Sequence, residues 1–158
     1  MNIFVLDLDP IKAAEAQCNK HVVKMCIETA QLLVAANKPG LFPWGITHVN
    51  HPCAKWVRES AQNYEWTLEH GIALCKEYTK RYEKVHAAQG IIALAHSVRP
   101  RTFNSVGLTP FAIAIKDTFY HVPNDPVTSY RAYYIGEKSK FAKWAPKAMA
   151  PSWWPWSE

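Results

Sequence analysis

The sequence predicts an all-α protein. It should form one compact domain over residues 1–158, with three main helices and an irregular C-terminal tail rich in tryptophan and proline. Apolar residues recur at three- and four-residue steps over long stretches, which indicates amphipathic helices. Two Asp-Pro pairs, Asp9-Pro10 and Asp125-Pro126, are typical helix starts. No internal repeat, low-complexity tract or linker divides the chain.

The helices can be placed from these signals. The first is expected from Pro10 to about Ala36, where the sequence Asn37-Lys38-Pro39-Gly40 ends it. The second is expected from Pro52 to about Val85, followed by a shorter helical piece from Ile91 to His96. The third should run from Val127 to about Lys138.

The remaining segments are predicted to be irregular. Residues 2–6 are interpreted as a short strand or an extended lead-in segment. Thr109-Pro110 is a further cap signal, before a short apolar segment from Phe111 to Ile115. Beyond Lys140 the chain contains too many prolines for a long helix.

Composition and charge narrow the classes of function. Eighteen Lys and Arg against thirteen Asp and Glu give a formal charge of +5, which is compatible with an anionic partner such as nucleic acid. The N-terminus lacks the basic start of a signal peptide, and no apolar run approaches the roughly 18 residues that span a bilayer. The four cysteines form no Cys-x-x-Cys pair, so reduced thiols in a cytoplasmic protein are expected, with no membrane partner.

No metal site or cofactor is expected. His48, His51 and Cys53 lie close together, but their spacing matches no recognised zinc motif. The six glycines form neither a P-loop nor a dinucleotide fingerprint, which argues against ATP- or NAD-dependent chemistry. A Gly-x-Ser-x-Gly elbow is also absent, so a hydrolase triad is not indicated.

One polar stripe on the first helix attracts attention. At about 100° per residue, five polar residues fall within roughly 80° of one another, while the rest of the circumference is largely apolar. These residues are Gln17, Lys20, Lys24, Glu28 and Gln31. The stripe is either a solvated seam or the floor of an active site, because buried charges without partners are costly.

The stripe carries an amine and a carboxylate. An amine can attack an electrophilic carbon and form an imine, and a positioned glutamate can transfer protons. Lys20, Lys24 and the α-amine of Met1 are the candidate amines, and Glu28 is the candidate carboxylate. Lysines and a glutamate on one helix face are also common in any helix.

Two other regions are suited to binding nucleic acid. Arg131 with Ser129 and Tyr130 is suited to holding a phosphate and stacking on a base. In the tail, cations alternate with aromatic residues that would stack on unpaired bases or, alternatively, cap the core. The tryptophans concerned are Trp144, Trp153 and Trp154.

Taken together, these residues resemble the pyrimidine-dimer DNA glycosylase family, that is, the phage endonuclease V-like excision proteins and their bacterial relatives. The resemblance is carried mainly by the first-helix block Asn19-Lys20, Lys24, Glu28 and Gln31. Three further features follow in the same order. They are His51-Pro52 before a helix with Trp56, the basic segment from Cys75 to Arg81, and Asp125-Pro126 followed by Trp153-Trp154-Pro155.

The resemblance implies a fold and a mechanism. Members of this family have a compact all-α fold and flip a base out of damaged duplex DNA. They cut the glycosidic bond with the N-terminal α-amine and then cleave the backbone by elimination. A first-helix glutamate is the essential carboxylate, and Glu28 matches it, with Lys20 and Lys24 as its basic neighbours.

The sequence differs from the family at the nucleophile. Asn2 is larger than the residues that usually permit removal of the initiator methionine. Three alternatives therefore stay open: Met1 supplies the amine, a lysine side chain replaces it, or the lyase chemistry is lost.

The leading hypothesis is a DNA glycosylase, with or without abasic-site lyase activity, that acts on a damaged or modified pyrimidine in DNA. His21 and Gln31 would orient water or base edges, and His51 would line the substrate site. Phosphates would be held by Arg99, Arg101 and Arg131. The alternatives are a non-catalytic nucleic-acid-binding protein and an enzyme acting on a free nucleotide or nucleoside.

Overall fold

The computed structural model describes residues 1–156, and within them the fold is all-α, as predicted. Its three longest helices are α2 (Asn19–Ala35), α4 (Ala61–Tyr82) and α6 (Pro126–Lys138). Three shorter helices, α1 (Pro10–Glu15), α3 (Pro52–Val57) and α5 (Gln89–Ser97), and a 3-10 turn η1 (Thr118–Tyr120) complete the order. No helix in this part of the chain is both long and apolar enough to cross a membrane.

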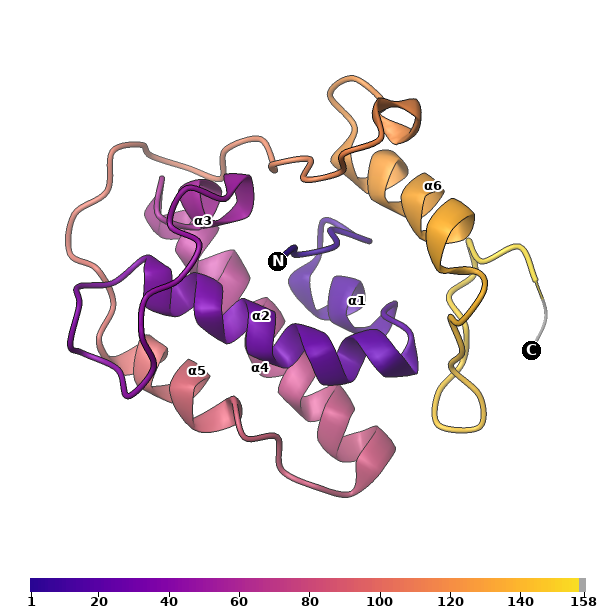
Figure 1. Ribbon diagram of the computed structural model, residues 1–158, viewed down its shortest axis with the longest axis horizontal. Coiled ribbons are helices and arrows are strands. Elements are labelled where there is room, and N and C mark those ends of the chain that lie inside the picture. Colours follow the sequence, from indigo (N-terminus) through magenta and orange to yellow (C-terminus); the bar gives the residue numbers. More distant parts are fainter. Residues whose placement is uncertain (157–158) are drawn as a thin grey trace.

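The core is built around α2 and α4. These two helices pack against each other, with α1 also against α4, and with α5 against both long helices. Figure 1 shows α6 beside this bundle, with η1 beyond it at the same end of the molecule. The four cysteines are buried and free, as expected from the sequence.

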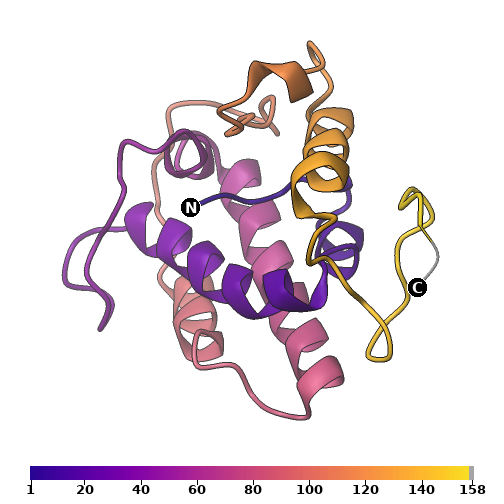
Figure 2. The same cartoon turned by 45° about the vertical axis from the view of Figure 1, so that its right-hand side comes forward.

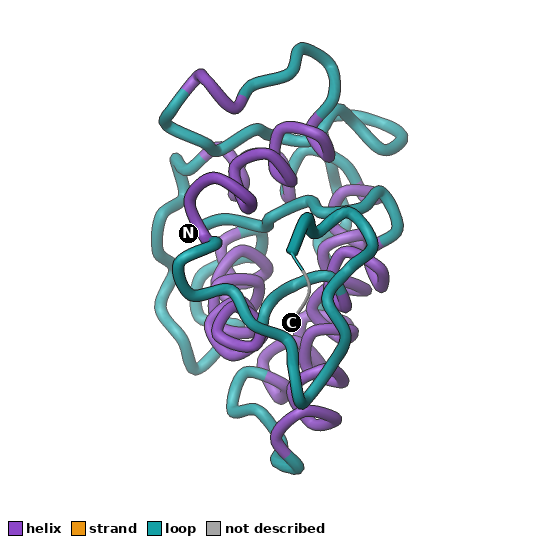
Figure 3. The backbone as a smooth tube through the Cα atoms, turned by 90° about the vertical axis from the view of Figure 1, so that its right-hand side faces the viewer, coloured by secondary structure: helices purple, strands orange, loops and turns teal. Residues whose placement is uncertain are grey.

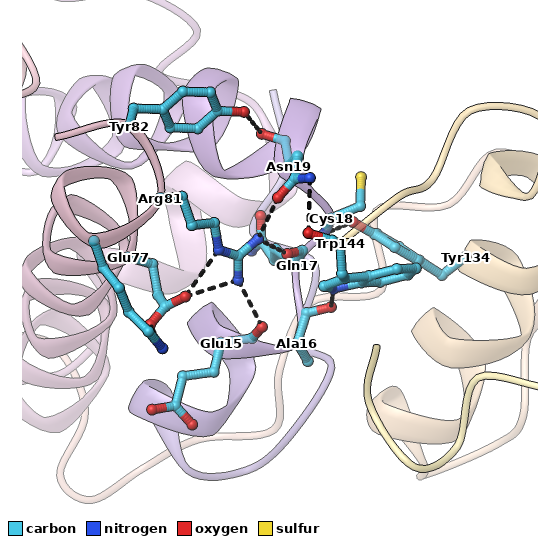
Figure 4. A network of polar contacts seen from close by, with 11 residues as sticks. Glu15, Ala16, Gln17, Cys18, Asn19, Glu77, Arg81, Tyr82, Tyr134 and Trp144 are labelled. Atoms are coloured by element: carbon cyan, nitrogen blue, oxygen red, sulfur yellow. Dashed lines mark hydrogen bonds and ion pairs between the residues drawn. The ribbon is translucent and has the colours of Figure 1, made fainter. Parts of the chain in front are cut away.

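The predicted first helix is in fact two helices. α1 ends at Glu15 and α2 begins at Asn19, although no proline or glycine lies between them. The backbone carbonyls freed by this break are bound by side chains from distant parts of the chain (Figure 4). Arg81 donates to the carbonyls of Gln17 at 2.7 Å and Glu15 at 3.0 Å, and the Trp144 indole donates to that of Ala16 at 3.1 Å.

The predicted second helix is also divided. α3 ends at Val57, and α4 begins at Ala61 after Ser60, whose side chain accepts from the Asn63 amide at 3.0 Å. The helix then ends at Tyr82, because Glu83 adopts a left-handed conformation with φ 55°. The prediction of one continuous helix overlooked the serine cap inside it.

The third helix and the irregular segments follow the prediction more closely. α6 begins at Pro126, with the Asp125 side chain accepting from the Thr128 amide at 2.9 Å. Thr109-Pro110 starts no helix: residues 109–115 have no regular secondary structure. Residues 2–6 form neither helix nor strand, and the segment turns at Phe4, where the Leu6 amide donates to the Phe4 carbonyl at 2.8 Å. The tail after α6 is loop, as Figure 3 shows.

Candidate active site

The N-terminal segment lies inside the molecule. Residues Ile3 to Leu6 are buried, and Figure 2 shows the segment passing through the middle of the fold among α2, α4 and α6. The Gln17 amide donates to the Ile3 carbonyl at 3.2 Å, and Arg131 donates to the Leu6 carbonyl at 2.8 Å. A buried backbone needs such partners, since unpaired buried carbonyls are costly.

Asn2 and Phe4 set the direction of this segment. The Asn2 side chain accepts from the amides of Ile3 at 2.8 Å and Phe4 at 3.3 Å, and it donates to the Ala114 carbonyl at 3.0 Å. Phe4 has φ 56°, a left-handed conformation that is strained for a bulky residue. Its ring stacks on His21 with centroids 4.7 Å apart. These contacts hold the chain end at a fixed place.

The N-terminus of the chain lies next to the carboxylate of Glu28. The Met1 amine lies 3.8 Å from Glu28 Oε2, and the Asn2 backbone amide donates to the same oxygen at 2.8 Å. Lys24 Nζ lies 3.2 Å from Glu28 Oε1, one helical turn earlier on α2. Glu28 is only 8% exposed. A carboxylate this buried requires charged and hydrogen-bonding partners, and the N-terminus and Lys24 supply them.

These groups open into a cleft of about 920 Å³. Met1, Lys24 and Glu28 form one side, with His51 beside them. The facing wall is formed by residues 113–117 and by three side chains of α6, namely Tyr133, Glu137 and Lys138. A volume of this size is typical of pockets that enclose a small ligand. The polar stripe was expected to be either a solvated seam or the floor of an active site. Because Lys24 and Glu28 line this cleft, the structure favours the second alternative for these two residues.

Histidine 51 borders the cleft and also begins α3. Its Nδ1 accepts from the Cys53 amide at 3.2 Å. Burial lowers the pKa of His51, and the positive N-terminus and His48 lower it further. Its ring is thus favoured in the neutral form, in which Nδ1 can accept this hydrogen bond.

The other site candidates on α2 lie outside the cleft lining. His21 is buried behind Phe4, and burial, with the charges of Lys138 and Lys24, lowers its pKa to about 4. Its ring stacks on Phe4, which lines the cleft, and His21 itself is not part of the lining. Lys20 Nζ lies over the Phe141 ring at 5.2 Å from the centroid. Neither Lys20 nor Gln31 lines the cleft.

The arginines predicted to hold phosphates are not gathered at the cleft. Arg99 pairs with Glu65 at 2.6 Å, and Arg101 lies on an exposed loop. Arg131 binds the Leu6 carbonyl and Asp7, and its guanidinium lies over the Trp153 ring at 5.4 Å. Arg131 therefore braces the N-terminal segment with a half-buried side chain.

Two further α6 residues are internal where contact with DNA was expected. The Ser129 hydroxyl donates to the Asp125 carbonyl at 2.8 Å and accepts from the Val122 amide at 2.8 Å. The fully buried Tyr130 hydroxyl donates to the Ala112 carbonyl and accepts from the Ala114 amide, both at 2.9 Å. Tyr130 thereby holds Ala114 of the facing wall in position, and Ser129 fixes the loop that precedes α6.

The tail tryptophans cap the core, which was the alternative prediction for them. Trp144 is fully buried and Trp154 nearly so, with ring centroids 4.9 Å apart. Trp153 is partly buried against Tyr134 and Arg131. In this arrangement Trp144 cannot stack on a base, because none of its surface is accessible.

The facing wall was missed from the sequence, although α6 carried a signal for it. Tyr130 and Tyr134 are four residues apart and buried, so they mark the core-facing stripe of the helix. Tyr133 and Glu137 form a second i,i+4 pair on the adjacent face, and this face borders the cleft. Residues 113–117 had no comparable signal, because their position depends on contacts to Asn2 and Tyr130.

One family of known proteins is similar to this chain. The family model for pyrimidine dimer DNA glycosylase matches residues 1–89, more than half of the chain. The match includes Met1, Lys24, Glu28 and His51, and it spans α1 to α4. No curated protein and no solved structure matches the chain. The chain therefore belongs to the pyrimidine dimer DNA glycosylase family, and its expected substrate is DNA.

Proposed function

We propose that this protein is a DNA glycosylase with abasic-site lyase activity, acting on a damaged or modified pyrimidine. The observation that carries the proposal is the N-terminal amine, 3.8 Å from a buried glutamate at the side of a 920 Å³ cleft. Membership of the family supports the glycosylase part. The amine and carboxylate together support the lyase part.

In this proposal the Met1 amine attacks C1′ of the damaged nucleotide. The new carbon–nitrogen bond forms as the glycosidic bond breaks, and the base departs with the electron pair of that bond and takes up a proton. The C1′–O4′ bond then breaks, so that the sugar ring opens and an imine forms: the attacking nitrogen loses a proton, and O4′ keeps the electron pair and takes up a proton. Removal of a C2′ proton then expels the 3′ phosphate, and water releases the cleaved strand from the imine.

Glu28 has two roles in this series of reaction steps. Its negative charge stabilises the positive charge that develops at the sugar, and its oxygen accepts and returns protons. Lys24 Nζ lies 3.2 Å from the other carboxylate oxygen, so the charge of Glu28 is balanced when the cleft is empty.

Met1 is a stronger candidate nucleophile than the lysines. α-Amino groups are as a class less basic than lysine side chains, so a larger fraction is unprotonated near neutral pH. The Met1 side chain is only 2% exposed, which fixes the residue that carries the amine. If Met1 is removed after synthesis, the Asn2 nitrogen takes its place, 2.8 Å from Glu28.

Borohydride trapping tests the proposal. Wild-type protein incubated with a duplex that contains one abasic site should give a covalent adduct when the imine is reduced. Protease digestion and mass spectrometry should locate the deoxyribose on the N-terminal peptide and show whether the chain starts at Met1 or Asn2. An adduct on Lys24 would reassign the nucleophile, and the absence of any adduct would refute the imine chemistry.

Glu28→Gln is the companion variant. We expect it to reduce turnover by about a hundredfold or more, the usual range for a lost proton-transfer group, with little change in DNA affinity. Glu69→Gln, at an exposed glutamate of α4 outside the cleft, is the matched control and should retain activity. Full activity in Glu28→Gln would refute the assignment of this carboxylate.

A further inference from the structure

One aromatic side chain stands out from the surface near the cleft. Phe119, in the middle of η1, is 84% exposed. Phenylalanine usually lies in the interior, so an exposed ring on an ordered turn is informative only if its surroundings hold it there. In Figure 1 the η1 turn lies beyond α6, at one end of the molecule.

The turn that carries Phe119 is held at both ends. The Asp117 side chain accepts from the Phe119 amide at 2.9 Å. His121 Nε2 lies 2.8 Å from the Ile115 carbonyl oxygen, and the Val122 amide donates to the Ser129 hydroxyl at 2.8 Å. The exposed ring is therefore presented by a preorganised turn.

Tyr120 fixes the same turn to α6. Its hydroxyl donates to Glu137 Oε1 at 2.8 Å, and its ring makes an edge contact with Tyr133, with centroids 5.4 Å apart. The ring lies so close to Gly136 that a Cβ there would be 2.7 Å from Tyr120 Cε1. The absence of a side chain at position 136 thus lets the turn sit directly on the helix.

These contacts place Phe119 at the rim of the cleft. Lys116 and Asp117, just before η1, line the cleft, and so do both α6 partners of Tyr120. Three lysines, Lys24, Lys116 and Lys138, line the same cleft, and together with the Met1 amine they exceed its three carboxylates by one positive charge. The carboxylates belong to Glu28, Asp117 and Glu137. The positive charge of the cleft suits the phosphates of a nucleic acid. The exposed apolar ring suits the stacked bases inside a DNA duplex.

We propose that Phe119 is a wedge that enters the base stack of the DNA next to the nucleotide held in the cleft. This inference rests on the proposed function. Taking a nucleotide out of a duplex costs unstacking energy, and an apolar side chain that fills the gap offsets part of it. A wedge on a rigid turn loses little conformational entropy when it inserts.

The test compares duplex and single-stranded substrates. The same oligonucleotide with one abasic site is supplied in both forms, and the ratio of the cleavage rates is measured. Phe119→Ala should lower the duplex-to-single-strand ratio about fivefold or more, the usual effect of losing an aromatic side chain that stacks on a base. Phe119→Leu, which keeps an apolar side chain, should restore part of the ratio.

Val106→Ala is the matched control. Val106 is 95% exposed, lies on a different loop and does not line the cleft. It should leave the ratio at the wild-type value. An unchanged ratio in Phe119→Ala would overturn the wedge, as would an equal fall in Val106→Ala. A role for Phe119 toward a protein or lipid partner would give the first of these results.

A second readout separates the wedge from the chemistry. With 2-aminopurine beside the abasic site, binding of wild-type protein should raise the fluorescence as the base unstacks, and Phe119→Ala should raise it less. This signal needs no cleavage. If wild-type protein gives the signal but no borohydride adduct, the proposed function fails and the wedge stands; the opposite result rejects the wedge alone.

Discussion

At the scale of single residues, Arg81 shows how one buried cation sets the path of the chain. Its guanidinium pairs with Glu77 at 2.8 Å and binds the backbone carbonyls at the break between α1 and α2. Its side chain has no accessible surface. The same break leads into the helix that carries Lys24 and Glu28, so this contact helps to determine the orientation of the site.

Arg81→Met should strongly destabilise the fold. It leaves Glu77 buried with fewer partners and removes the donors to the Glu15 and Gln17 carbonyls, so we expect a loss of about 3–5 kcal/mol in the free energy of unfolding. Urea denaturation followed by circular dichroism measures it.

Lys80→Ala is the natural control for this variant. Lys80 pairs with the same glutamate at 3.1 Å but is 65% exposed, so its loss should cost about 0.5 kcal/mol or less. Equal losses in the two variants would contradict the role assigned to Arg81.

At the scale of elements, the contact between η1 and α6 predicts that Gly136→Ala changes the stability in opposite directions in the wild type and in a Tyr120→Ala variant. Gly136→Ala should destabilise the wild type, because the new Cβ would overlap the Tyr120 ring. In a Tyr120→Ala background the same change should stabilise the protein by about 0.5–1 kcal/mol, the usual gain of alanine over glycine inside a helix.

A double-mutant cycle of unfolding free energies measures this coupling. If Gly136→Ala had the same effect in both backgrounds, the ring would not determine the identity of residue 136. The cycle also reports on the proposed wedge, because Tyr120 fixes the turn that presents Phe119.

The sequence predicted the outer ends of the helical segments better than the breaks inside them: the expected ends at Ala36 and Lys138 lie within one residue of the observed ones, but the starts of α2 and α4 were missed. Asp9-Pro10, His51-Pro52 and Asp125-Pro126 all begin helices, because a capping side chain and a proline act locally. The break after Glu15 could not be predicted, since its partners Arg81 and Trp144 are more than sixty residues away in sequence. The spacing of apolar residues indicates which face of a helix is buried, but it does not indicate contacts with residues far away in sequence.

At the scale of the whole molecule, the sequence predicted one side of the cleft and missed the other. Lys24 and Glu28 were found because helical periodicity places them on one face, and they do meet the Met1 amine. The facing wall depends on how α6 and residues 113–117 fold back over the N-terminal segment. Residue types alone favoured Arg131 and Tyr130 for binding. In the fold, the half-buried Arg131 side chain donates to the Leu6 carbonyl, and the buried Tyr130 hydroxyl donates to the Ala112 carbonyl.

Two buried histidines make the stability of the whole fold depend on pH. Burial lowers the pKa of His70 to about 4, although its contact with the Pro10 carbonyl opposes the shift, and His21 is lowered to a similar value. His70 Nδ1 lies 2.9 Å from the Pro10 carbonyl oxygen and Nε2 lies 3.3 Å from the Gln17 amide nitrogen, an arrangement that suits a neutral ring.

Because both pKa values are lower in the folded state than the ordinary 6.5, the unfolded chain binds more protons between pH 6.5 and 4. The stabilisation is therefore complete above pH 6.5 and is lost as the pH falls toward 4. Between pH 7.5 and 5 we expect the free energy of unfolding to fall by about 2 kcal/mol for each histidine. Urea denaturation across this range measures the slope, and His70→Gln should remove the share of about 2 kcal/mol that belongs to His70. A free energy that stays constant over the range would show that these rings keep their ordinary pKa in the folded protein.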